Sequence, residues 1–298
     1  MIRRLATAAL LGTALLVPIG VQSAMAGTTP AHIQRGVNTA QRYAAANGMS
    51  TGVAVLNLTS GQIWQAGAAR QRFASASVVK TMIAARLLAT GQMHGTVAKK
   101  AWSMITRSDN QAAWDLYPLV GRDHLMPWIE AHYHLSGIGA PPTMHGVWGS
   151  TQITARGMVR FYDAVHNDAA VWPWLLRAMH AYKQVSASGE PNAFGLAKAA
   201  PRSAVKNGWD TNRDVRHPSN AIVNSTGIAL HDHWAVAILS EGPHRLYYAA
   251  GERIVTGEAL RVIRGMTGGS IPPPQAPHRG GDRPWDPGLP ELAPVGRP

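Results

Sequence analysis

A serine and a lysine lie three residues apart in the segment FASASVVKTMIAAR, residues 73–86. If this segment is helical, Ser77 and Lys80 project from one face, about one turn apart. A serine hydroxyl is a poor nucleophile unless an adjacent base takes its proton, and a lysine can be that base where burial and nearby cations keep its amine neutral. The spacing alone therefore permits a lysine-activated serine but does not establish it. The alternative is that Ser75 or Ser77 is only a helix N-cap and Lys80 an ordinary helix residue.

Two further motifs follow in order along the chain. The sequence S-D-N occupies residues 108–110, at the junction of two predicted helices, and K-N-G occupies residues 206–208, at the end of a predicted strand. Each also has a structural interpretation, because Ser108 or Asp109 can cap a helix and N-G favours a hairpin turn. Residues 209–219 weaken the hairpin interpretation, since they do not alternate as a returning strand does.

The elements expected from apolar periodicity bring these motifs to one place. The predicted helices cover residues 32–48, 78–90, 96–107, 110–120, 122–133, 153–166, 171–182 and 251–266. The predicted strands cover residues 51–58, 61–67, 203–209, 220–230 and 233–242. Short connections favour one antiparallel sheet, flanked by the terminal helices, with the helical block beside it and a cleft between the two parts. A loop rich in glycine and proline interrupts the helical block at residues 137–149.

The order S-x-x-K, S-D-N, K-x-G is similar to the signature of the penicillin-recognising serine enzymes, namely class A β-lactamases and D-alanyl-D-alanine peptidases (penicillin-binding proteins). The resemblance covers residues 33–266, and flanks such as MITRSDNQAAWDLY, VKNGW and IVNSTG resemble a compact branch from high-GC Gram-positive bacteria. It implies an α+β, β-lactamase/transpeptidase-like fold: a five-stranded antiparallel sheet flanked by helices, plus an all-α subdomain. The α/β part is expected at about residues 27–70 and 200–266, and the all-α part at about 71–199.

The resemblance implies a catalytic role for four side chains: Ser77, Lys80, Ser108 and Lys206. Lys80 would take the proton of Ser77, which would form an acyl-enzyme. Ser108 would pass a proton to the leaving nitrogen. Lys206 would orient Ser108 and attract a substrate carboxylate.

The resemblance also implies four substrate-binding residues: Asn110, Asn207, Gly208 and Trp209. Asn110 would bond the amide carbonyl of the substrate. The backbone amides of Ser77 and Trp209 would form an oxyanion hole, in which one donor is often worth about 3 kcal/mol. Trp148 is also expected near the cleft.

Three departures from the family pattern concern substrate binding and the second half of the reaction. Asn207 stands where the family usually has threonine or serine, so carboxylate binding is expected to differ. The strand segment NAIVNSTG lacks the arginine that many class A enzymes use for the same carboxylate, and neither Arg213 nor Arg216 is assigned that role from the sequence. Residues 137–151 contain no Asp or Glu, whereas class A enzymes carry in this loop the glutamate that activates the deacylating water.

The missing glutamate predicts slow deacylation, because acylation at Ser77 needs no such base. The nearest acids, Glu130 and Asp163, belong to flanking helices and lack the family pattern. The predicted function is an exported serine hydrolase acting on β-lactams or cell-wall D-Ala-type peptides. The alternatives are an inactive module that binds or senses cell-wall peptides on the same fold, and an esterase.

The composition fits an exported protein. Residues 1–26 have the basic start, apolar run and A-x-A site of a signal peptide, with cleavage expected before Gly27. The chain has no cysteine, so neither disulfides nor thiolate metal sites are expected, and its histidines lack metal-binding spacing; no cofactor is predicted. The net charge of +12 is dispersed along the chain, so no nucleic-acid patch is expected. The charge either favours an anionic cell-wall polymer as a partner or only keeps the protein soluble. A monomer without a membrane span is expected, with a disordered tail over residues 267–298.

Overall fold

The computed structural model describes residues 28–211 and 220–274. Its centre is a five-stranded antiparallel sheet in the order β2-β1-β8-β7-β6. The strands are β1 (Ser50–Asn57), β2 (Ile63–Gly67), β6 (Ala204–Thr211), β7 (Asn220–Ala229) and β8 (Trp234–Pro243). Each lies within one or two residues of its predicted range, which confirms the predicted five-stranded sheet.

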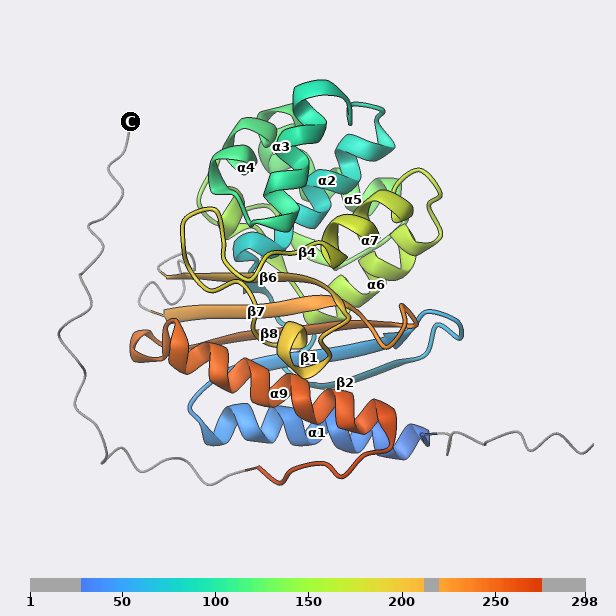
Figure 1. The fold of residues 1–298 in the computed structure, drawn as a ribbon, viewed down its shortest axis with the longest axis vertical. Coiled ribbons are helices and arrows are strands. Elements are labelled where there is room, and N and C mark those ends of the chain that lie inside the picture. The colour runs from blue at the N-terminus through green and yellow to red at the C-terminus, as the bar shows by residue number, and fades with distance from the viewer. Residues whose placement is uncertain (1–27, 212–219, 275–298) are drawn as a thin grey trace, which may run out of the picture.

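One face of the sheet is covered by the two terminal helices, α1 (Pro30–Ala46) and α9 (Ala249–Thr267), which run side by side (Figure 1). The helices approach closely because glycines meet at their contact: a Cβ on Gly36 would lie 2.7 Å from the Cα of Gly265. The buried residues of α1 recur every three or four positions, which puts them on one stripe facing the sheet.

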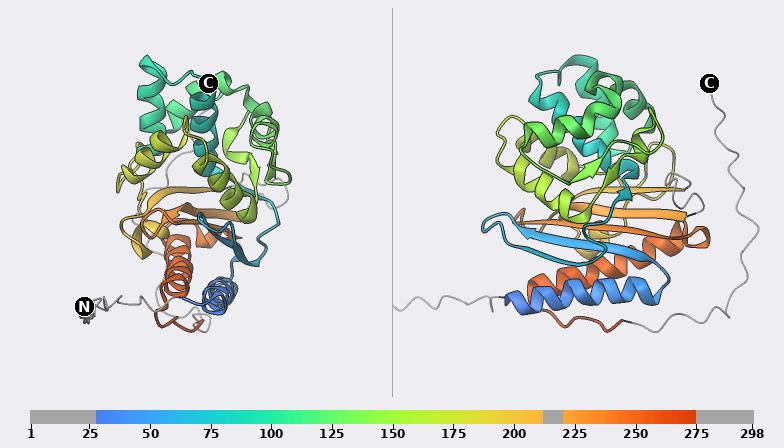
Figure 2. Two further views of the ribbon diagram at one scale, coloured as in Figure 1. Left: turned by 90° about the vertical axis from the view of Figure 1, so that its right-hand side faces the viewer. Right: turned by 180° about the vertical axis from the view of Figure 1, so that it is seen from behind.

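The other face carries the helical part of the molecule (Figures 1 and 2). Helix α6 (Ala155–His166) lies directly on β1 and β8. The remaining helices of this part are α2 (Lys80–Ala89), α3 (Gly95–Thr106), α4 (Asn110–Leu116), α5 (Leu125–His132) and α7 (Trp172–His180). All of them fall inside the predicted helical block. Apolar clusters fill both sides of the sheet, so the sheet is buried on both faces.

Four short elements, three strands and one helix, were not predicted. A second sheet joins β3 (Phe73–Ala74), β5 (Gln152–Ile153) and β4 (Gly139–Ala140) in the order β3-β5-β4. Two-residue strands show no alternation in the sequence, so periodicity cannot reveal them. This sheet pins the loop over residues 137–151 to the segment that leads to Ser77. A four-residue helix, α8 (Leu196–Ala199), precedes β6.

The chain ends bear on two expectations. The expected signal peptide, residues 1–26, lies outside the described residues, as do Arg213 and Arg216 and most of the expected tail. Among the described residues after α9, the Pro273 carbonyl accepts a hydrogen bond from Arg261 Nη2 at 2.5 Å, which holds this segment against the helix. Within the described ranges, none of the helices combines the length and the apolar character needed to cross a bilayer.

Candidate active site

Ser77 lies in a tight, strained turn between a strand and a helix. Strand β3 leads into a 3₁₀ turn over Ala76–Val79, and α2 begins at Lys80. Ala76 has φ 45°, a left-handed conformation that is costly for a residue with a side chain and is typical of functional turns. Neither Ser75 nor Ser77 caps α2, whose N-cap is Val79, so the capping interpretation of these two serines is wrong.

The strained turn is held from the central sheet by Asn224 on β7. Its side-chain Nδ2 donates to the carbonyls of Ala74 at 2.9 Å and Ser75 at 3.2 Å, just before Ser77. Its Oδ1 accepts the backbone N–H of Ser240 on β8 at 3.2 Å. Asn224 is fully buried, so these bonds form in a low-dielectric interior where each is costly to lose.

Strand β6 also lies directly against the turn. It is an edge strand, paired only with β7 in the central sheet, so its other edge faces the 3₁₀ turn. A Cβ on Gly208 would lie 2.8 Å from the Ser77 backbone nitrogen, which is too close for a side chain. Gly208 therefore permits the close approach of β6 to the nucleophile turn, because it has no side chain.

Two buried lysines meet at Ser108. Lys80 Nζ donates to the Ser108 carbonyl at 2.8 Å and to Asn110 Oδ1 at 2.7 Å. Lys206 Nζ donates to Ser108 Oγ at 2.9 Å and to the Asn207 carbonyl at 3.0 Å. Ser108 itself has φ 52°, a second left-handed residue beside the pocket. The Ser108 hydroxyl thus lies between the two amines, 3.5 Å from Lys80 Nζ.

Burial sets the protonation of both lysines. It lowers the pKa of Lys80 well below its usual 10.5, and the nearby charge of Lys206 lowers this pKa further, against weaker opposing effects of Asp109 and Asp210. Burial alone lowers the pKa of Lys206 to about 7. A neutral amine keeps two N–H donors, and the two shorter bonds of Lys80 Nζ, to the Ser108 carbonyl and Asn110 Oδ1, use both. Its lone pair is then available to accept a proton, as a general base requires.

Asp109, the middle residue of the S-D-N motif, has a structural role. Its Oδ1 accepts the backbone N–H of Ala112 at 3.0 Å and its Oδ2 accepts the hydroxyl of Ser103 at 2.8 Å. Burial opposes its ionisation, but these hydrogen bonds hold its pKa below the usual value. The three residues of the motif therefore have different roles. Asp109 caps α4, whereas Ser108 and Asn110 contact Lys80.

Asn207 does not lie where a substrate ligand was expected. Its Nδ2 donates to the carbonyls of Asn192 at 3.0 Å and Phe194 at 3.1 Å, and it is buried. Successive side chains of a strand point to opposite faces, so Asn207 faces away from Lys206 and Gly208. The expectation that Asn207 donates to a substrate carboxylate is therefore corrected: it anchors the segment that precedes α8.

The loop over residues 137–151 presents an indole to the base. The ring centroid of Trp148 lies 4.6 Å from Lys80 Nζ, in cation–π geometry. The Trp148 side chain is buried, and its Nε1 has no hydrogen-bond partner among the described residues. The two acids nearest to this loop in the sequence serve elsewhere: Glu130 accepts the N–H of Ile138, and neither Glu130 nor Asp163 is among the residues that line the pocket.

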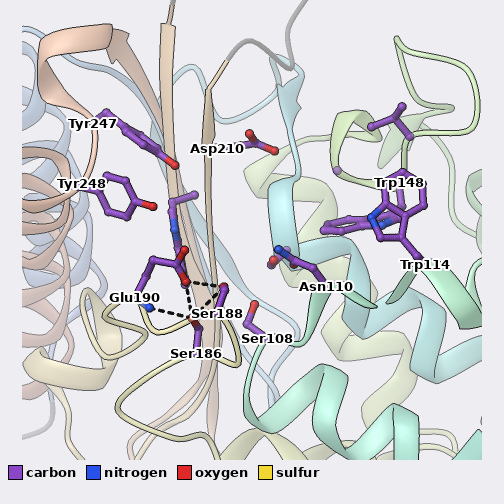
Figure 3. Close-up of a pocket in the computed structure, with 14 residues that line it drawn as sticks. Ser108, Asn110, Trp114, Trp148, Ser186, Ser188, Glu190, Asp210, Tyr247 and Tyr248 are labelled. Carbon is purple, nitrogen blue, oxygen red and sulfur yellow. Dashed lines mark hydrogen bonds between the residues drawn. The ribbon is translucent and has the colours of Figure 1, made fainter. Parts of the chain in front are cut away.

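These residues surround a cavity of about 170 Å³ (Figure 3). Five of its lining residues were singled out from the sequence: Ser77, Ser108, Asn110, Trp148 and Trp209. Nine others line it too: Trp114, Val147, Gly149, Ser186, Ser188, Glu190, Asp210, Tyr247 and Tyr248. Lys80 and Lys206 lie beneath the wall, each at most 1% exposed.

Sequence signals existed for some of the missed residues. Glu190 ends the polar run SASGE between a predicted helix and a predicted strand, where loops carry function. Asn224 is a polar residue inside the apolar strand NAIVNSTGIA, which indicates a buried hydrogen-bonding task. No comparable signal marks Tyr247 and Tyr248, because only the tertiary fold brings them to this pocket.

Comparison with known proteins bears on the fold. No family model and no curated protein matches the sequence. Solved structures do match: the β-lactamase of Streptosporangium roseum has a TM-score of 0.59 at 16% identity, over 78% of this chain and 98% of that one. The β-lactamase of Burkholderia phymatum gives 0.62 at 15% identity, over 78% and 99%. A variant of an ancestral Gram-negative class A β-lactamase gives 0.53 at 17% identity, over 76% and 96%.

These matches confirm the β-lactamase-like fold that the three motifs predicted. At 14–17% sequence identity, these matches show the fold alone.

Proposed function

We propose that this chain, which has the β-lactamase-like fold, is a serine hydrolase that forms an acyl-enzyme on Ser77. The burial of Lys80 beside the nucleophile turn carries this proposal. Burying an ammonium group without a carboxylate partner is expensive, and among the described residues neither Lys80 nor Lys206 forms an ion pair with an acid. A general base explains why a lysine is kept there.

The proposed acylation begins with proton transfer from Ser77 to Lys80. Lys80 accepts the proton of the Ser77 hydroxyl as its oxygen attacks the carbonyl carbon of the substrate. The backbone amides of Ser77 and Trp209 stabilise the oxyanion of the tetrahedral intermediate, at about 3 kcal/mol per donor. The bond from the carbonyl carbon to the leaving group then breaks. Ser108 gives its proton to the leaving group and is reprotonated from Lys80 or Lys206.

Asn110 has a place in this scheme because its Oδ1 is already bonded to Lys80. Its amide nitrogen is left to donate to the amide carbonyl of the substrate. Trp209, the residue after Gly208 on β6, also lines the pocket. The substrate class is a small amide or ester of the β-lactam or cell-wall-peptide type, bound without a metal or cofactor.

Hydrolysis of the acyl-enzyme is slow in this proposal. The loop that faces Lys80 supplies an indole and no carboxylate, so the water that completes the reaction lacks the base that class A enzymes use. The Trp148 ring also covers Lys80 on that side. The acyl-enzyme is therefore long-lived, and Ser77 is expected to accumulate as an adduct with a reactive acyl donor.

A second candidate function is a non-catalytic module that binds cell-wall peptides in the same pocket. One observation favours it: Asn207, expected to bind the substrate carboxylate, is bonded to backbone carbonyls instead. We prefer the hypothesis of an enzyme. A module that only binds has no need for a buried lysine with a lowered pKa at the end of the nucleophile turn.

Export is part of the proposal. Residues 1–26 are proposed as a cleaved signal peptide, and the mature monomer is placed outside the cytoplasm, where its net positive charge favours an anionic cell wall. N-terminal sequencing of protein recovered from the medium and from the cell-wall fraction tests this: Gly27 is the expected first residue, and retention of Met1 in the cytosol contradicts it.

The test of the activity is a time course of intact mass. The mature protein and Ser77→Ala are incubated with a penicillin and, separately, with an uncharged thioester. A persistent adduct on the wild type only supports slow deacylation, and a transient adduct with loss of the acyl donor reveals a base supplied by another residue. Equal masses before and after incubation with both donors overturn the enzyme reading in favour of the binding module.

A further inference from the structure

The catalytic pocket has an acidic wall in a strongly basic chain. The net charge is +12, yet the charged side chains among the described lining residues are two carboxylates, Glu190 and Asp210. Lys206, the lysine of the K-x-G motif, is poorly placed to bind an anionic substrate group. Its side chain is 1% exposed and donates hydrogen bonds to Ser108 Oγ and to the Asn207 carbonyl. Burial lowers its pKa to about 7.

Glu190 is fixed in place as an anion. The hydroxyls of Ser186 and Ser188 both donate to its Oε2, the first at 2.6 Å, and the Glu190 N–H donates back to Ser186 Oγ at 3.1 Å. Partial burial opposes ionisation, but these hydroxyl bonds hold the pKa of Glu190 below its usual value. No lysine, arginine or histidine of the described chain forms an ion pair with it.

Aromatic rings stand beside this carboxylate. Tyr247 and Tyr248 line the pocket on the same side as Glu190 (Figure 3), with ring centroids 4.1 Å apart. Trp209 lines it as well, braced edge-on by Phe194 at 5.8 Å. Burial raises the pKa of Tyr247, and the charges of Asp210 and Glu190 add to that rise, so its phenol stays neutral. Neutral aromatic faces next to a carboxylate attract cations.

The carboxylate lies on the leaving-group side of the site. Figure 3 shows Ser186, Ser188 and Glu190 next to Ser108, the residue that protonates the leaving group in the proposed mechanism. Trp148 and Trp114 stand on the opposite wall, where the buried Nε1 of Trp148 has no partner among the described residues. Because Glu190 lies beside Ser108, it faces the leaving group, and the wall formed by Trp148 and Trp114 faces the acyl part.

We propose that the leaving group of the substrate carries a cation, a substituted ammonium or guanidinium, and that Glu190 is the residue that selects it. This inference rests on the proposed acyl-enzyme function and narrows its substrate class. Leaving groups that carry a carboxylate, such as a terminal D-Ala or the corresponding part of a penicillin, meet a negative wall and acylate Ser77 more slowly.

Three thioesters with one acyl group test the inference. All carry N-acetylglycine; the leaving thiols are thiocholine, its tert-butyl isostere in which carbon replaces the charged nitrogen, and mercaptopropionate. Thiol release is followed with a chromogenic disulfide, to which the cysteine-free protein contributes no background. The wild type is expected to prefer the cationic thioester over its isostere by roughly threefold and over the anionic one by roughly tenfold, typical of a partly exposed ion pair.

Variants assign the preference to one carboxylate. In Glu190→Gln the cationic-to-isostere ratio is expected to fall to near one. Asp232→Asn makes the same change in net charge beyond the opposite end of β7 and should keep the wild-type ratio. The salt dependence of the wild type is a further test. The cationic-to-isostere ratio is expected to fall between low salt and about 0.5 M NaCl, because exposed charges are screened.

The outcomes separate this inference from the proposed function. If no thioester gives a Ser77-dependent adduct by intact mass, both are overturned. If all three acylate Ser77 at similar rates, or the anionic one is fastest, the cation preference is wrong and the acyl-enzyme stands. A preference that persists in Glu190→Gln overturns the role of Glu190, and a ratio that falls equally in Asp232→Asn shows a global charge effect instead.

Discussion

Replacing Asn224 by alanine tests how the sheet positions the nucleophile. Its side chain makes three buried bonds, to the carbonyls of Ala74 and Ser75 and from the N–H of Ser240. Asn224→Ala leaves three buried polar groups without that partner, each worth about 1 kcal/mol. The expected loss is about 2–4 kcal/mol of unfolding free energy, or roughly 5–15 °C in Tm for a domain of this size.

A second effect separates positioning from stability. The φ of 45° at Ala76 is maintained only while neighbouring contacts hold the turn. Without Asn224 the turn relaxes and moves the Ser77 hydroxyl from its place near the base. Because small misplacements of a nucleophile are costly, the acylation rate should fall roughly ten- to hundredfold. Both quantities are measured on one preparation: thermal unfolding, and adduct formation well below the transition temperature.

Ser225→Ala is the matched control. Ser225 is the next residue of β7, is equally buried, and points to the other face, where its hydroxyl accepts the N–H of Leu196 at 3.0 Å. Its loss should lower stability by about 1–2 kcal/mol and leave acylation unchanged. If Asn224→Ala is destabilised but acylates at the wild-type rate, Asn224 only stabilises the fold and the positioning argument is refuted.

Three other perturbations follow from the burial of charged and aromatic groups. Acylation should rise with pH through the depressed pKa of Lys80 and level off well below 10.5, and Lys206→Met should move this limb to higher pH; a pH–rate profile checks both. Burial raises the pKa of Glu258 from 4.5 to about 8, so the folded state holds a proton that the unfolded chain releases. The contribution of Glu258 to stability is then greatest below about pH 4.5 and falls by up to about 1.4 kcal/mol per pH unit towards pH 8. Urea unfolding should lose this component of the pH dependence in Glu258→Gln. Trp148→Ala should shorten the lifetime of the acyl-enzyme in the mass time course, because it uncovers Lys80 to water.

The elements that carry long periodic patterns were predictable from the sequence. The strands around Val205, Val223 and Val236 and the amphipathic helices have apolar residues at a regular period, which their burial requires. The two-residue strands β3, β4 and β5 have no period, so only tertiary contact defines them. Their consequence is functional, since they tie the loop that carries Trp148 to the segment before Ser77.

The site was predictable as far as motif spacing reaches. Ser77, Lys80 and Ser108 were identified because their chemistry needs fixed residue types at fixed offsets. The face on which a strand residue points depends on register and pairing, which motif spacing does not give. The sequence therefore did not reveal that Asn207 donates to backbone carbonyls. Glu190 comes from a loop between elements, where no period indicates which side chains face a cavity.

The most direct test of the central claim is to locate the acyl group. The peptide Phe73–Lys80 lies between two trypsin sites and contains two serines, so tandem mass spectrometry after incubation with the uncharged thioester distinguishes Ser77 from Ser75. The acyl group is expected on Ser77, and it should be absent from Lys80→Met treated in parallel. An acyl group on Ser75 or on another peptide, or undiminished labelling of Ser77 in Lys80→Met, would contradict a lysine-activated serine nucleophile.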